Sequence, residues 1–187
     1  SDSDTAAANQ ALVDVYDEFA TTENMKSFLL ANSDRAYDEG WYKAGELNTV
    51  AAVVNDYVFG DNASVSEVLS NGNTFYAVRV MESAMVPDSV YVKYAPATVE
   101  NVDSLLNVAE PMWITQVPGY EAVMTAAKNS KVTVNGLVFN VLDRTAPVAK
   151  KKVAVLEKTA VASKETVNGY YAQANTFATK AAGKYEN

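Results

Sequence analysis

A β-hairpin is predicted by residues 65–80, VSEVLSNGNTFYAVRV, in which an Asn-Gly pair separates two runs rich in strand-forming residues. Asn71-Gly72 between such runs is the strongest short-range hairpin signal that a sequence offers. The same signal returns around Asn135-Gly136 in residues 132–142, VTVNGLVFNVL. Two antiparallel hairpins are therefore the starting point for predicting the fold.

The segments around the two hairpins follow a common order. Apolar residues at helical spacing precede the first hairpin over residues 47–59, and the second over residues 99–109 and 119–127. A link that contains proline follows each hairpin and leads to a further strand, at residues 90–94 and 153–156. We therefore expect an internal repeat. The predicted fold class is α+β, with two small units in tandem and a C-terminal helix, and the expected domains are residues 1–88, 89–150 and 151–187.

The two ends of the chain give simpler patterns. The first dozen residues are polar or small and predict a frayed end, and the alternation over residues 13–19 predicts a short strand. A short helix is expected behind an N-cap at Thr22. The last helix is expected to start at a Ser163 cap and to end at Gly183. Its amphipathic face comprises Val167, Tyr170, Tyr171, Ala174, Phe177 and Ala181.

Composition excludes several classes of chemistry. The chain has 187 residues, 15 Lys and Arg against 23 Asp and Glu, a net charge of −8, and neither histidine nor cysteine. Histidine-based triads, thiolate nucleophiles, zinc fingers, iron–sulfur centres and disulfides are therefore excluded. An acidic chain also argues against binding to nucleic acid. The basic run Lys150-Lys151-Lys152 is expected to be a solvated strand entry, and we predict no cofactor and no metal ion.

Carboxylates and chain ends add little further chemistry. The pairs Asp17-Glu18, Asp38-Glu39 and Asp56 with Asp61 are expected in solvated loops, because nothing in the sequence supplies a cleft for a glycosidase-like pair.

The chain begins Ser1-Asp2-Ser3-Asp4 and has no apolar leader, and no stretch approaches the length of a membrane helix. We expect a piece cut from a longer protein.

Two tryptophan-containing pairs occupy comparable places in the two halves. Trp41-Tyr42 and Trp113-Ile114 each come before the helix that leads to a hairpin. In one interpretation these aromatic residues line a groove for an extended apolar peptide. In the other, which the large area of an aromatic side chain favours, they fill the core of each half.

Several motifs over residues 30–187 resemble the parvulin-type peptidyl-prolyl isomerases. Ser33-Asp34 followed by Gly40-Trp41-Tyr42-Lys43-Ala44-Gly45-Glu46-Leu47 is similar to the family's Ser-Asp loop and Gly-Trp-Phe signature. Ala77-Val78-Arg79-Val80 resembles its closing strand, and Met112-Trp113-Ile114 and Val138-Phe139-Asn140-Val141 repeat both features more faintly. Pro87-Asp88-Ser89-Val90 and the segment 153–187 resemble parts of envelope folding factors of the SurA and PpiD type from Bacteroides-like bacteria.

The resemblance implies a periplasmic folding factor, with a parent anchored in the inner membrane and unfolded polypeptides, such as outer-membrane proteins, as clients. The family's strand histidines are absent, with Tyr94, Tyr76 and a position near Leu137 or Val138 in their places. We therefore expect a non-catalytic, peptide-binding module. The alternatives are an active isomerase, in which Tyr76 and Tyr94 substitute for the histidines, and a structural spacer. The expected peptide-binding residues are Trp41, Tyr42, Tyr76, Tyr94, Met112 and Trp113.

Overall fold

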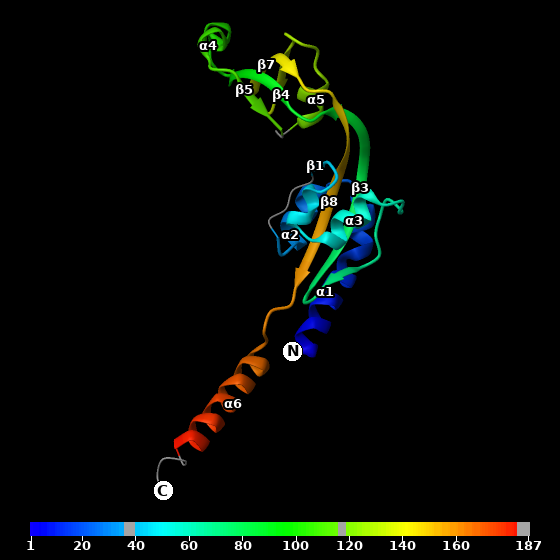
Figure 1. The fold of residues 1–187 in the computed structure, drawn as a ribbon, viewed down its shortest axis with the longest axis vertical. Coiled ribbons are helices and arrows are strands. Elements are labelled where there is room, and N and C mark those ends of the chain that lie inside the picture. Colours follow the sequence, from blue (N-terminus) through cyan, green and yellow to red (C-terminus); the bar gives the residue numbers. More distant parts are fainter. Residues whose placement is uncertain (36–39, 116–118, 183–187) are drawn as a thin grey trace. The chain divides into compact units, whose positions relative to one another are not determined.

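The fold combines helices with two four-stranded antiparallel sheets. Figure 1 draws the ribbon of this computed structural model. The structure describes residues 1–35, 40–115 and 119–182. The strand order is β1-β8-β3-β2 in one sheet and β5-β4-β7-β6 in the other, and the last element is a helix. The predicted α+β class and the C-terminal helix are therefore confirmed.

The elements follow one another in the chain as listed here. The helices are α1 (Asp2–Thr21), α2 (Met25–Asn32), the 3-10 helix η1 (Glu46–Thr49), α3 (Ala52–Phe59), α4 (Val102–Val108), α5 (Tyr120–Thr125) and α6 (Lys164–Ala182). The strands are β1 (Gly40–Tyr42), β2 (Leu69–Asn71), β3 (Thr74–Pro87), β4 (Val90–Pro96), β5 (Met112–Ile114), β6 (Lys131–Val134), β7 (Leu137–Arg144) and β8 (Pro147–Thr159).

Contacts divide the chain into two compact units, each assembled from separate segments. Unit 1 comprises residues 1–38, 60–79 and 154–187, and unit 2 comprises residues 39–59 and 80–153. The long strands β3 and β8 contribute residues to both units. The consecutive domain boundaries expected from the sequence remain a prediction.

Both predicted hairpins are present, and their turns differ. In the second hairpin, Asn135 and Gly136 occupy the two turn positions with φ of 48° and 77°, as a type I′ turn requires. In the first, Asn71 pairs with Thr74, so the turn is shifted by one residue and Gly72 comes first with φ of 62°. Glycine at that position is the mark of a type II′ turn.

The two sheets have similar layouts, but the strands that follow the hairpins are exchanged relative to the predicted internal repeat. β4 follows the first hairpin in the chain and pairs with the second, and β8 follows the second hairpin and lies in the sheet of the first. In each sheet a three-residue edge strand carries the tryptophan, Trp41 in β1 and Trp113 in β5. In each, a hairpin forms the other side of the sheet, β2–β3 or β6–β7. The strand between these parts comes last in the chain in one sheet (β8) and first in the other (β4).

The N-terminal predictions were wrong. Residues 2–21 form α1, where a frayed end and a short strand were expected. A capping box between Ser1 and Asp4 begins the helix, and Ala8, Leu12 and Phe19 are buried along one face. Of the alternating residues that predicted a strand, only Phe19 belongs to this buried stripe and Val13 is exposed, because burial in a helix follows a spacing of about four residues. Thr22 is the C-cap of α1, and Asn24 caps α2.

Three other elements differ in extent from the predictions. The helix expected over residues 47–59 is divided into η1 and α3. The strand expected over residues 65–69 is reduced to an isolated bridge between Val65 and Arg79, followed by β2. The helix expected from residue 119 is the short α5. Asp38-Glu39 and the Gly183 cap lie outside the described residues.

The core of unit 2 packs one face of the second sheet against α5 and β1. Val92 of β4 pairs with Val141 of β7 on this face, and Val90 and Phe139 belong to the same buried cluster. They are buried together with residues of the neighbouring elements, namely Trp41, Val86, Tyr120, Val123 and Met124. β5 forms the edge of this sheet.

Candidate functional site

Two of the six residues expected to bind peptide belong to the core. The Trp41 side chain is only 5% exposed, and its ring stacks on Tyr120 with centroids 6.4 Å apart. Tyr76 is buried in unit 1, where burial raises the pKa of its phenol. For Trp41 the core-filling interpretation is therefore correct, and the peptide-binding hypothesis rests on the remaining four residues.

Met112 and Trp113 lie in the edge strand β5 and are half-exposed. Trp113 retains 50% of its accessible surface and packs against Tyr91 of β4, its cross-strand partner, with centroids 5.1 Å apart. Met112 pairs with Val92 and so lies on the opposite face of the strand, the face on which the core packs. We call Tyr91, Met112 and Trp113 the β5 edge surface.

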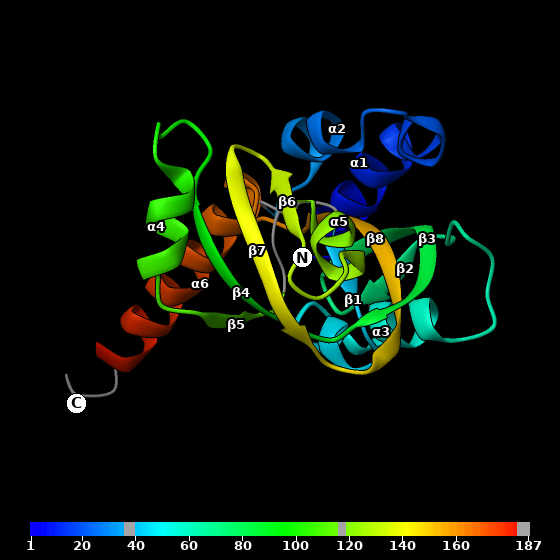
Figure 2. The same cartoon turned by 90° about the horizontal axis from the view of Figure 1, so that it is seen from above.

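Further exposed apolar side chains lie on the element that leads into β5. Leu105 and Val108 of α4 are exposed, and α4 packs against β4 (Figure 2). Tyr94 of β4 is also partly exposed, with its ring 5.8 Å from that of the buried Phe139. Exposed apolar groups on neighbouring elements are typical of surfaces that bind other polypeptides.

Tyr42 and Tyr76 do not join this surface. Tyr42 pairs with Lys151 at the end of β1 and is partly buried. Tyr76 belongs to unit 1, whereas Tyr94 belongs to unit 2. The two tyrosines that the isomerase alternative needs therefore lie in different compact units.

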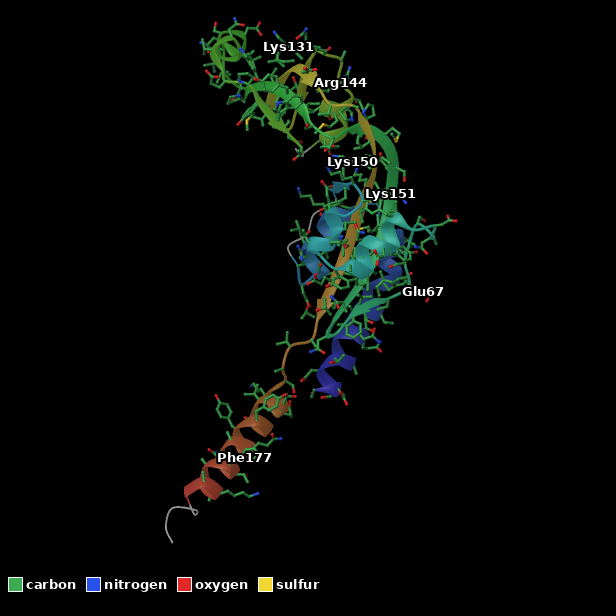
Figure 3. The ribbon with its side chains drawn as sticks, in the orientation of Figure 1. Glu67, Lys131, Arg144, Lys150, Lys151 and Phe177 are labelled. Atoms are coloured by element: carbon green, nitrogen blue, oxygen red, sulfur yellow. The ribbon has the colours of Figure 1, made fainter. Side chains whose placement is uncertain are left out.

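A buried charge network in unit 2 was not predicted from the sequence. Lys150 of β8, labelled in Figure 3, has a side chain only 1% exposed, so the expectation of a solvated strand entry was wrong for this residue. Its ammonium group donates to the Tyr120 hydroxyl and lies 3.2 Å from Asp88 Oδ1 and 3.4 Å from the Asp88 carbonyl oxygen. Three acceptors thus face its three N–H donors.

Asp88 and Tyr120 are themselves satisfied by further partners. The other Asp88 carboxylate oxygen accepts from Lys43 Nζ at 2.7 Å, and the Tyr120 hydroxyl donates to the Pro87 carbonyl oxygen at 3.1 Å. The Lys43 hydrogen bond, supported by Lys150, holds the pKa of Asp88 below its usual value, and the same bond raises the pKa of Lys43. Burial raises the pKa of Tyr120. Every group of this network has a partner, so its role is structural.

The two lysines that follow Lys150 are held by other parts of unit 2. Lys151 Nζ donates to the Val58 carbonyl oxygen at 2.7 Å and lies 5.8 Å from the centre of the Phe59 ring. Lys152 Nζ lies 3.5 Å from a carboxylate oxygen of Glu82. These contacts of Lys151 and Lys152 join β8 to α3 and to β3. The sequence alone could not predict these contacts, because lysines between apolar residues also occur on solvated strands.

Comparisons with known proteins identify no family for the chain. No family model, no curated protein and no solved structure matches it. Within residues 1–35, 40–115 and 119–182, no acidic side chains gather into a group that could hold a metal ion. None of the helices in this part of the chain has the length and apolar character needed to cross a membrane.

Proposed function

We propose that unit 2 binds extended, unfolded polypeptide segments along the edge of β5. The observation that carries this proposal is the half-exposed Trp113 on an edge strand, packed against Tyr91. An edge strand offers unpaired backbone groups to an incoming strand, and aromatic side chains beside it supply apolar contact area. Addition of a strand to a sheet edge is a common mode of peptide recognition.

The alternation along β5 indicates which segments would bind. Trp113 and Met112 point to opposite faces of the strand, so an added strand would have an apolar neighbour on each face. Neither face of β5 carries a charged side chain. Segments with apolar residues on both faces are buried in folded proteins and are exposed only in unfolded chains. This chemistry supports unfolded polypeptides as the ligand class.

The resemblance to parvulin-type envelope folding factors points to the same ligand class. Under this proposal the chain is a non-catalytic, parvulin-like part of a periplasmic chaperone that holds unfolded clients. Catalysis of prolyl isomerisation requires polar groups arranged around a twisted amide. The polar groups that unit 2 does gather, around Asp88, are already bonded to one another.

An NMR titration tests the proposal. The ¹⁵N-labelled chain is titrated with a short unfolded peptide that has apolar residues at successive positions, and so on both faces of an added strand, and contains one proline. We expect the largest amide shifts at Met112 and Trp113. Trp113→Ser should weaken binding about tenfold, because a central aromatic contact contributes more than about 1 kcal/mol.

Met85→Ser provides the matched control. Met85 is also an exposed apolar residue of unit 2, but it lies in β3, outside the β5 edge surface. This variant should bind the peptide as the unmodified chain does. Equal losses in both variants, or shifts centred away from β5, would refute the edge site. NMR exchange spectra of the peptide also measure the rate of cis/trans exchange at its prolyl bond. Faster exchange in the presence of the chain would contradict a non-catalytic role.

A further inference from the structure

The C-terminal helix α6 exposes the whole of its apolar face. Tyr170, Tyr171 and Phe177 are 62%, 68% and 70% exposed, and Val167 is also exposed. Figure 3 labels Phe177 on this helix. The first turn of α6 is bonded to α1, where the Thr166 hydroxyl donates to Asp4 Oδ2 at 2.8 Å. The apolar face begins directly after this attachment.

The composition of α6 argues that the helix needs a partner. Its 19 residues include a glycine, three threonines and two asparagines, which are poor helix formers. Even sequences that favour helix need about 12–15 residues to be helical alone in water, so 19 residues with these poor helix formers exceed that length by little. Packing of an apolar face normally supplies the missing stability.

The apolar positions of α6 follow the spacing of a coiled coil. Val167, Tyr170, Ala174, Phe177 and Ala181 alternate by three and four residues. This is the a/d pattern of a heptad repeat, in which a second helix packs along the seam. Tyr171 lies beside the seam and widens it.

We infer that α6 pairs with α6 of a second copy of this chain in an antiparallel arrangement. A two-fold axis level with Ala172 places Val167 opposite Phe177 of the second copy, and Tyr170 opposite Ala174. These layers each combine an aromatic side chain with a smaller one, which fills the space between the helices evenly.

The charges of α6 are compatible with self-pairing. The described helix carries only Lys164, Glu165 and Lys180. Positions e and g of the heptad flank the seam on its two sides. In the antiparallel register Lys180, at position g, faces Thr166 of the second copy. Lys164, at position e, faces Ala178 on the other side of the seam. No two like charges meet along the seam, and none of the seam positions is charged.

The exposed aromatic rings of α6 supply most of the area that a specific dimer needs. At about 150–250 Å² for each aromatic side chain, the three exposed rings present roughly 300–500 Å² per copy. Two copies therefore offer roughly 600–1,000 Å², before Val167 and the alanines are included. Specific interfaces start at about 1,000 Å² in total.

Sedimentation of the full chain tests the inference. We expect a concentration-dependent dimer, which Phe177→Glu should convert to monomer while the near-UV spectrum of the two units is unchanged. Thr176→Glu is the matched control: it adds the same charge at the neighbouring position, outside the seam, and should leave the dimer intact. A monomer at all concentrations, or a dimer that survives Phe177→Glu, would overturn the proposal.

Cysteine cross-linking tests the orientation, since the native chain has no cysteine. Tyr171→Cys lies near the two-fold axis of the antiparallel pair and should form a disulfide-linked dimer on oxidation. Ala181→Cys lies about nine residues from that axis, so the two thiols would be roughly 27 Å apart along the helices. Cross-linking at position 181 but not at 171 would overturn the antiparallel arrangement. Binding of the monomer to lipid vesicles with ordering of α6 would also overturn it, by identifying a different occupant.

Discussion

Removal of the buried ammonium group of Lys150 should destabilise unit 2 more than any change at its surface. Lys150→Ala deletes three methylene groups, worth about 0.8 kcal/mol each, and hydrogen bonds to charged groups, worth about 1.5–3 kcal/mol. Asp88 retains Lys43, and its side chain is 31% exposed, which limits the cost of the charge left behind. We expect a loss of about 4–5 kcal/mol in the free energy of unfolding.

Lys150→Met separates the two contributions. Methionine keeps most of the apolar volume and loses only the ammonium contacts, so the expected loss is about 1.5–3 kcal/mol. The surface pair of Lys128 with Asp143, 3.8 Å apart, supplies the control. Lys128→Met should change the stability by less than about 1 kcal/mol.

Urea unfolding followed by tryptophan fluorescence measures the stability of unit 2 in each variant, because Trp41 and Trp113 both belong to unit 2. The buried Trp41 stacks on Tyr120, so its emission reports on the packing around the network. If Lys150→Met were as stable as the unmodified chain, or more stable, the network would not stabilise unit 2, and our account of Lys150 would be refuted.

Three further predictions concern other parts of the fold. The pKa of Asp88 is lower in the folded chain, so its contribution to stability is present above about pH 4, the unfolded value, and is lost as the pH falls through the folded value. Asp88→Asn should therefore reduce the fall of the melting temperature at acidic pH. An unchanged fall of the melting temperature would contradict this. Gly119→Ala should destabilise unit 2 by at least roughly 2 kcal/mol, because φ is +73° and the new Cβ would lie 2.0 Å from Val134 Cγ1; an unchanged urea midpoint would refute it. Ser66→Ala should cost unit 1 about 1–3 kcal/mol, read from the circular-dichroism melt, because it removes the buried hydroxyl to which the Val78 N–H donates at 2.8 Å.

Features that depend only on neighbouring residues could be predicted from the sequence. The turns at Gly72 and at Asn135-Gly136 require positive φ, which few residue types adopt, so both hairpins could be located. The cap at Ser163 and the periodicity of residues 167–181 likewise located α6. Each of these signals is contained within one short segment.

Only the tertiary structure decided which of several equivalent residues became buried. Trp41 and Trp113 occupy matching strands, yet Trp41 is covered by Tyr120 and Trp113 remains half-exposed. Lys150 resembles a solvated lysine until the fold brings Asp88 to it from 62 residues away. Burial depends on partners that are distant in sequence, and local patterns carry no information about which partners those are.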